Sequence, residues 1–218
     1  MAKIGILLSG CGVKDGSEIH EAVLTMLALD RLGVERLCLA PNVAQSDVVN
    51  HFTGESASAS RNVLVESARI ARGEISDLAK VSASDMDALI LPGGFGAAKN
   101  LCDFAVAGVR TEVYPEVSRL LWEMHEAKKP IGAICIAPVV IARVFGGLRP
   151  KVTIGNDLAT AKILESFGAQ HQECPVDDIV VDQENRLVTT PAYMLGPGLR
   201  EIASGIEKLV HQIVAMAA

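Results

Sequence analysis

Aromatic residues are scarce in this chain, long apolar runs are missing, and neither sign of charge forms a block. Phe, Trp and Tyr make up 4% of the 218 residues, while half of the residues are apolar, so aliphatic side chains must fill the core. No stretch reaches the ~18 uninterrupted apolar residues expected of a membrane-spanning helix. The net charge is −6, without a basic block, which argues against nucleic acid and anionic membranes as partners.

Disulfide and zinc patterns are missing as well. The five cysteines are widely spaced, no C-x-x-C occurs, and no Cys/His cluster has the spacing of zinc ligands. We therefore expect no metal or other cofactor, reduced thiols and a cytoplasmic protein. The apolar start of the chain stops at Ser9-Gly10, too early for a signal peptide, and is better explained as a first buried strand.

Short apolar runs alternate with amphipathic segments along the chain. Strands are predicted at Lys3–Ser9, Glu35–Leu39, Ala88–Leu91, Ile131–Ile134, Ile179–Asp182 and Arg186–Thr190, the last two as a hairpin. Helices are predicted at Ser17–Leu32, Arg61–Arg72, Glu116–Ala127, Pro138–Phe145, Asp157–Phe167 and Gly198–Met216. This order predicts a single α/β domain over residues 1–218, a three-layer, flavodoxin-like sandwich with a mostly parallel sheet. The polar segment Gln45–Ser60 stays unassigned, as either a lid or an insertion.

Ligands of parallel sheets bind beyond the carboxyl ends of the strands, so the loops that follow strands are the candidate site. Cys135 lies between a buried strand and a helix that Pro138 can start. The helix N-terminus favours negative charge, which predicts a lowered thiol pKa. Small neighbours permit a tight turn of the kind that exposes nucleophiles in other α/β enzymes. The alternative is an inert buried cysteine.

A second loop follows the strand Ala88–Leu91 and contains Gly93 and Gly94. Paired glycines let backbone N–H groups approach a ligand closely, and two such donors form an oxyanion hole. A phosphate-binding loop is the weaker interpretation, because Lys99 is followed by Asn100 where a Ser or Thr is required. An ordinary turn into a helix is the third.

The third loop precedes the first helix, and its glycine spacing does not match a dinucleotide-binding fingerprint. Glu18 and Glu21 are three residues apart and lie on one side of that helix. They can offset the helix dipole, with Asp15 and Glu18 as a capping box, or place a carboxyl beside the thiol for proton transfer. Cys11 is the second candidate for a reactive thiol, and His20 is expected to be a helix-surface residue.

Taken together, these loops resemble those of the ThiJ/PfpI superfamily, whose fold is similar to that of class I glutamine amidotransferases. The superfamily motifs are Leu91–Gly94 and Ala133–Pro138. A closer likeness is to the ElbB-type branch of isoprenoid-biosynthesis-associated glyoxalases. It is carried by Ser9–Gly12, Asp15–Ala22, Pro92–Leu101, Cys174–Asp182 and Thr189–Met194.

The resemblance implies a site and an activity. It implies a nucleophile at Cys135, oxyanion donors in the backbone N–H groups of Gly94 and Ile136, and a glutamate against the thiol. Family spacing points to Glu21 for that glutamate, with Glu18 as the alternative. The implied activity is that of a glutathione-independent glyoxalase, a lyase that converts glyoxal or related small dicarbonyls to the hydroxy acid without a cofactor. A homodimer is implied by analogy.

One departure from the superfamily concerns the histidine found in many members on the strand after the cysteine helix. Here Gly155 occupies that position, and the later pair of His171 and Glu173 is not expected to be catalytic. Without that base we expect slow activity. Two alternatives stay open. One is a redox sensor or partner-binding protein in which Cys11 and Cys135 form a transient disulfide. The other is an amidotransferase-like subunit that does not hydrolyse glutamine.

Overall fold

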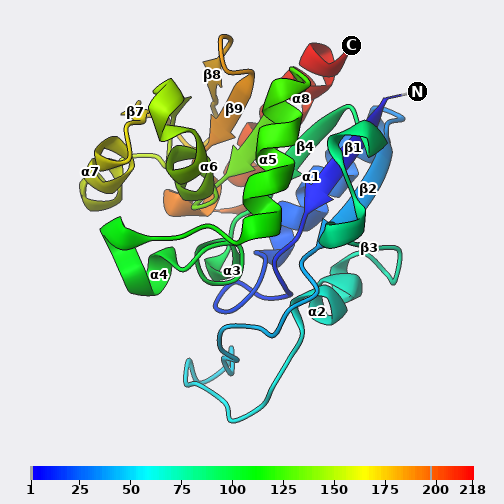
Figure 1. The fold of residues 1–218 in the computed structure, drawn as a ribbon, viewed down its shortest axis with the longest axis vertical. Helices are drawn as coiled ribbons and strands as arrows, with labels where there is room; N and C mark the ends of the chain where they lie inside the picture. The colour runs from blue at the N-terminus through cyan, green and yellow to red at the C-terminus, as the bar shows by residue number, and fades with distance from the viewer. Residues whose placement is uncertain (1, 197) are drawn as a thin grey trace.

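The computed structural model describes residues 2–196 and 198–218. Its central sheet consists of β1 Lys3–Leu7, β2 Glu35–Ala40, β3 Ser76–Asp77, β4 Ala88–Leu91, β5 Ile131–Ile134, β8 Val180–Asp182 and β9 Leu187–Thr190. The strand order is β3-β2-β1-β4-β5-β9-β8. Only β8 runs antiparallel to its neighbour, as the first strand of the predicted hairpin with β9. The mostly parallel sheet is therefore confirmed (Figure 1).

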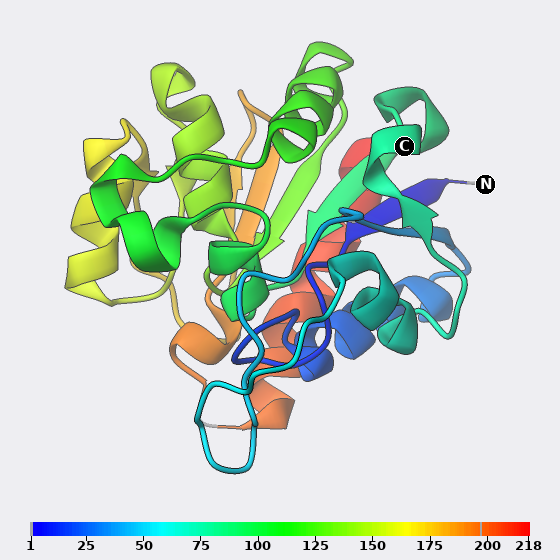
Figure 2. The same ribbon diagram turned by 60° about the horizontal axis from the view of Figure 1, so that its bottom comes forward.

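Helices cover both faces of this sheet, as Figure 2 shows from the side of the loops. They are α1 Ile19–Arg31, α2 Val63–Ile70, α3 Phe95–Lys99, α4 Phe104–Ala107, α5 Pro115–Glu126, α6 Pro138–Phe145, α7 Leu158–Ser166 and α8 Leu199–Ala217. Two of them begin with a proline, whose fixed φ suits the first helical turn. A third, α7, begins after Asp157, whose carboxylate accepts the N–H of Thr160.

The two faces of the sheet build two separate layers of core. Alternate residues of β1 point to opposite sides, with Ile4 and Ile6 against α1 and α8 and Leu7 in the layer that contains α5 and α6. All three side chains are fully or almost fully buried. The three-layer sandwich predicted from the sequence is thus present, and it fixes the strand ends on which the site is built.

The region after α6 differs most from the expected order. The strand after the cysteine helix is only β6 Lys151–Val152, and it pairs with β7 Gln170–His171 in a separate two-stranded sheet. Gly155 therefore lies beyond the end of a short strand outside the central sheet. A side chain at this glycine, whose φ is +91°, would approach the Cγ atom of Leu195 to 2.7 Å.

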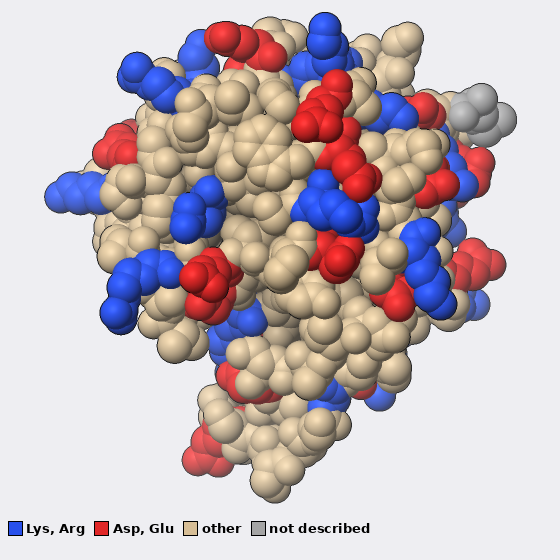
Figure 3. All heavy atoms as spheres, in the orientation of Figure 1, with Lys and Arg blue, Asp and Glu red and all other residues tan. Residues whose placement is uncertain are grey.

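The segment Gln45–Ser60, which the sequence leaves unassigned, runs out from the sheet and back as a loop with antiparallel sides. Isolated bridges pair Ala44 with Asn62 and Val49 with Ser56. The segment forms the extended loop at the bottom of Figure 1 and the corresponding projection in Figure 3. Basic and acidic side chains are interspersed over the face that Figure 3 shows. The projection is fixed to the loop before α1, because the Val49 N–H donates to Asp15 Oδ2 at 2.8 Å.

None of the helices described over 2–196 and 198–218 is both long and apolar enough to span a membrane. The longest, α8, is amphipathic and lies along the sheet beside α1. Its inner face is buried against β5 and β9, and its outer face carries charged residues.

Packing of α8 on the sheet leads to a stability prediction. Leu209 is fully buried over β5, so Leu209→Ala should lower the free energy of unfolding by about 2–5 kcal/mol. The matched control is Leu199→Ala on the same helix, because Leu199 is half-exposed. Its loss of unfolding free energy should stay below about 1 kcal/mol. Urea unfolding monitored by circular dichroism measures both, and equal losses would contradict the described packing.

Candidate active site

Cys135 lies at the sharp turn between β5 and α6. Its φ is +61°, in the left-handed region that residues other than glycine rarely adopt. The Cys135 N–H donates to the carbonyl of Thr190 at 3.0 Å, and this hydrogen bond fixes the turn to the end of the neighbouring strand β9. Only 7% of the residue is exposed. A strained, fixed cysteine at a strand end is the arrangement found at functional sites, and the predicted elbow is present.

Two glycines of the loop after β4, Gly93 and Gly94, lie next to this turn. Gly94 has a φ of +91°, and its backbone N–H, together with that of Ile136, lies within hydrogen-bonding reach of the Cys135 thiol. Gly93 has no room for a side chain, since a Cβ there would be 2.5 Å from the Cβ atom of Cys135 and 2.7 Å from Glu21 Oε2. The loop therefore brings backbone donors to the sulfur at a distance that only glycine permits.

Of the two candidate glutamates, Glu21 is the one that faces the thiol. Its carboxyl is completely buried within reach of Cys135. Oε2 accepts the Gly93 N–H at 2.8 Å, and Oε1 accepts the Tyr193 N–H at 3.3 Å. Glu18 has a different position, as the N-cap of α1, where its Oε2 accepts the Glu21 N–H at 2.7 Å.

Burial and the charge of Glu18 raise the pKa of Glu21 to about 8. Burial and the negative charge of Glu21 also raise the pKa of the Cys135 thiol well above its usual value. The predicted lowering of the thiol pKa is therefore wrong. The N–H groups of Gly94 and Ile136 do favour the thiolate, but desolvation and a like charge outweigh them.

Consequently, the thiol and the carboxyl both keep their protons at neutral pH, and they titrate as a coupled pair. The Glu21 carboxyl loses its proton near pH 8. Once ionised, it can take the proton of the thiol as the sulfur attacks an electrophile. The centre is thus a thiol with its own buried base, rather than a preformed thiolate.

Tyr193 and His20 form one edge of this centre, although the sequence patterns predict a part in the site for neither. Tyr193 follows β9, the strand beside β5, and it donates its backbone N–H to Glu21 as described above. Its hydroxyl oxygen lies 2.8 Å from His20 Nδ1. His20 is half-exposed on α1, as predicted for a helix-surface residue, and its Nδ1 lies 3.8 Å from Glu18 Oε1. Attention to the loop after every strand, including β9, would have found Tyr193.

Asn100 and Asp15 hold the loops of the site together. The side-chain amide of Asn100 donates to the carbonyls of Ser9 and Asp15 at 2.8 and 2.9 Å. Asp15 uses its carboxylate for Val49 of the projecting segment, as noted above, and not for Glu18. The predicted capping box of Asp15 and Glu18 is therefore wrong, because the projection binds the aspartate instead.

Cys11 lies in a different environment from Cys135. It is half-buried, and its pKa is raised mainly by burial and then by the charge of Glu66, a residue of α2. The neighbouring arginines Arg69 and Arg61 act in the opposite direction. Both cysteines are free thiols. The charged neighbours of Cys11 lie on α2, just before it and in the loop of Cys11 itself, whereas the thiol of Cys135 faces Glu21 on α1. The disulfide alternative therefore gains no support from the surroundings of the two thiols.

His171 belongs to β7 in the small sheet and accepts the Ile154 N–H at Nε2 at 3.3 Å. Burial lowers its pKa. The structure therefore gives this histidine a local backbone contact, and the base next to Cys135 is a glutamate.

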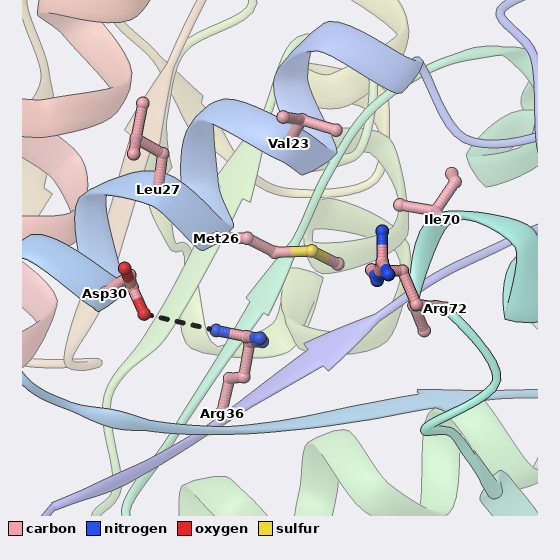
Figure 4. A pocket seen from close by; sticks show the side chains of 8 residues that line it. Val23, Met26, Leu27, Asp30, Arg36, Ile70 and Arg72 are labelled. Atoms are coloured by element: carbon pink, nitrogen blue, oxygen red, sulfur yellow. Dashed lines mark ion pairs between the residues drawn. The ribbon is translucent and has the colours of Figure 1, made fainter.

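No group of three or more His, Cys, Asp or Glu side chains is arranged to hold a metal ion in the described part of the chain. A surface groove does lie on the outer side of α1, lined by Val23, Met26, Leu27 and Ile70 and crossed by the ion pair of Asp30 and Arg36 at 3.6 Å (Figure 4). The helix thus turns Glu21 inward to the thiol, and Val23, Met26 and Leu27 outward to the groove.

An amidotransferase-like sheet with a strained cysteine at its carboxyl edge defines the class of protein, and comparison with known proteins agrees. The DJ-1/PfpI family model matches residues 11–194, so the chain belongs to the DJ-1/PfpI family. A solved isoprenoid biosynthesis protein with an amidotransferase-like domain from Ehrlichia chaffeensis is 40% identical over 98% of this chain and 99% of its own, with a TM-score of 0.91.

Two mammalian proteins are also similar over almost the whole chain. The mitochondrial ES1 protein homolog of Rattus norvegicus is 48% identical over 99% of this chain and 84% of its own length. The mitochondrial glutamine amidotransferase-like class 1 domain-containing protein 3 of Homo sapiens is 47% identical over 99% and 83%. Because both are named mitochondrial, the expectation of a cytoplasmic protein is wrong. Cysteine usage alone distinguishes reducing from oxidising surroundings, not one reducing compartment from another.

The close approach of Gly93 to the thiol and the carboxyl can be tested with a matched pair of variants. Gly93→Ala should lower the free energy of unfolding by about 1–3 kcal/mol and misalign Cys135 and Glu21. Gly147→Ala is the control, since a Cβ there meets nothing within 4 Å. Urea unfolding gives the stability, and mass spectrometry of iodoacetamide-treated protein gives the reactivity of Cys135. A Gly93→Ala variant indistinguishable from the control would contradict the described contact.

The raised pKa of Glu21 makes stability depend on pH. Between the ordinary value of 4.5 and about 8 the folded state keeps a proton on this carboxyl that the unfolded state releases, so stability falls as pH rises through this range. Glu21→Gln removes that loss. The unfolding free energy of the variant minus that of wild type should therefore be larger at pH 8.5 than at pH 5, by on the order of a few kcal/mol. Urea titrations at both pH values measure the difference, with exposed Glu184→Gln as control. A gap that does not change with pH would refute the assignment.

Proposed function

We propose that this protein is a cofactor-independent glyoxalase that converts glyoxal, and related small dicarbonyls, to the hydroxy acid through a cysteine hemithioacetal. The observation that carries the proposal is the buried Glu21 carboxyl against the Cys135 thiol, with the backbone N–H groups of Gly94 and Ile136 near enough to the same sulfur to favour its thiolate. A dicarbonyl needs a nucleophile, a base and an oxyanion site at one place, and these groups supply all three.

The first step forms a carbon–sulfur bond. The Glu21 carboxylate takes the thiol proton while the sulfur of Cys135 attacks one aldehyde carbon. The carbonyl oxygen gains the negative charge, next to the N–H groups of Gly94 and Ile136. Transfer of the proton from Glu21 to this oxygen completes the hemithioacetal and regenerates the carboxylate.

The second step is an internal oxidation and reduction. Glu21 removes the hydrogen from the carbon that bears sulfur, and the electron pair moves to the second carbonyl to give an enediol. Return of a proton to the second carbon yields a thioester of glycolate, so that one carbon is oxidised as the other is reduced and no external oxidant is needed. Water then cleaves the carbon–sulfur bond and releases glycolate, the Cys135 thiol and one proton.

The pH range of this reaction follows from the same carboxyl. Because Glu21 acts as a base only when ionised, the rate should rise with pH up to about 8. At neutral pH a minority of the molecules carry the carboxylate, which is consistent with the slow activity expected from a site without a histidine. Glutamine hydrolysis would require a histidine base, and Gly155 occupies the position of that histidine, so the amidotransferase-like alternative stays one without glutamine hydrolysis.

The names of the relatives bear on the pathway and the cellular location of this activity. An isoprenoid biosynthesis protein among the similar structures supports a link to isoprenoid biosynthesis, and the mitochondrial names support a mitochondrial location. The homodimer and the single domain over residues 1–218 stay predictions. Size-exclusion chromatography with light scattering tests the first of these directly.

Glyoxal turnover tests the proposal. Cys135→Ala should abolish conversion of glyoxal to glycolate, and Glu21→Gln should lower kcat by about 10²-fold. Cys11→Ala removes the other candidate thiol and should leave kcat within about twofold of wild type. Proton NMR of the product measures all three. Full activity in Cys135→Ala, or a loss in Cys11→Ala that equals it, would overturn the proposal.

A further inference from the structure

The proposed reaction requires protons to move between the buried carboxyl and water. Glyoxal and water yield glycolate and one proton, so each turnover must release a proton from the site. Glu21 holds that proton during the reaction but is completely buried. Its two oxygens are already engaged by the N–H groups of Gly93 and Tyr193. The polar groups nearest the carboxyl are therefore the candidates for the route by which this proton leaves.

The polar groups around Glu21 lead in one direction, toward α1 and the loop after β9. Glu18 is close enough for its charge to raise the pKa of Glu21, and also that of the Tyr193 phenol. Glu18 is itself 7% exposed. Its Oε1 lies 3.8 Å from Nδ1 of His20, the side chain of which is 52% exposed.

Tyr193 contacts both Glu21 and His20. Its backbone N–H reaches Glu21 on the inside, and its hydroxyl lies 2.8 Å from His20 Nδ1 on the outside. The two rings are 5.9 Å apart at a tilt of 42°. A phenol hydroxyl both donates and accepts a hydrogen bond, and an imidazole can take up a proton at one nitrogen while it releases another from the second. The phenol and the imidazole therefore have the properties of a proton relay, whereas the backbone N–H of Tyr193 only holds the Glu21 carboxyl in place.

We propose that Glu18, His20 and Tyr193 form the route by which the proton on Glu21 exchanges with solvent. The inference rests on the proposed function, and it assigns His20 and Tyr193 as positioning residues that act through Glu21 and do not touch substrate. In the absence of the family histidine, this route supplies the connection to water that the buried base lacks.

Deuterium incorporation into glycolate is the readout. It depends on how fast the proton on Glu21 exchanges with solvent during the lifetime of the enediol, and it does not depend on which step limits the overall rate. In D₂O, a proton that Glu21 takes from carbon and returns without exchange gives CH₂ in glycolate, whereas exchange before return gives CHD. Proton NMR separates the two products. The variants are His20→Gln and Tyr193→Phe, each keeping a side chain of similar size, with exposed His211→Gln on α8 as control.

We expect the fraction of unexchanged CH₂ product to rise about threefold or more in His20→Gln, and by a smaller factor in Tyr193→Phe. Added imidazole buffer should restore exchange in His20→Gln, an effect that a merely structural role for His20 would not produce. The KM for glyoxal should stay within about twofold. The control variant should match wild type in all three quantities.

The outcomes separate the two proposals. Unchanged CH₂ content in His20→Gln and Tyr193→Phe, with normal wild-type turnover, overturns the relay and leaves the glyoxalase proposal intact. A rise in CH₂ content that imidazole does not reverse also overturns the relay, because the effect is then structural. No glycolate from the wild-type protein overturns the glyoxalase proposal and the relay with it.

Discussion

The thiol of Cys135 and the carboxyl of Glu21 face each other in a space that solvent hardly enters, and the remaining features of the site follow from that contact. Burial raises the pKa of both groups, and the charge that one would carry opposes the charge of the other. The pair is therefore neutral in its resting state, with both protons in place. Reactivity must come from loss of the carboxyl proton. Ionisation of Glu21, and not of the Cys135 thiol, therefore sets the reactivity of the site.

This contact depends on four loops that meet at the carboxyl edge of the sheet. The order β1-β4-β5-β9 in the middle of the sheet brings together the loops before α1, after β4 and after β5, and adds the loop after β9. Gly93 and Gly94 allow the backbone to approach, and Asn100 joins the loops behind them. The arrangement leaves Cys135 with a strained, positive φ. Asp15 in the loop before α1 accepts a hydrogen bond from the projecting segment.

Elements with strong local signals could be predicted from the sequence. The strands at 88–91 and 131–134 and the helix at 138–145 have the predicted bounds, because apolar runs between glycine and proline signals leave few alternatives. The thiol pKa could not be predicted, since desolvation depends on the tertiary packing around Cys135. The contact of Tyr193 with Glu21 joins residues 172 positions apart, and periodicity carries no information on such pairs. The segment 45–60 has no periodicity, and its place is set by tertiary contacts, among them those with Asp15, Lys99 and Asn100.

The pH dependence of Cys135 alkylation tests the central claim most directly. Wild-type protein and Glu21→Gln are treated with iodoacetamide from pH 6 to pH 10, and mass spectrometry follows the peptide that contains Cys135, separately from the other thiols. The account predicts an inflection near pH 8 in the wild type, where the carboxyl ionises, and its disappearance in Glu21→Gln. Identical profiles for the two proteins would show that the carboxyl does not govern the thiol, and would contradict the account.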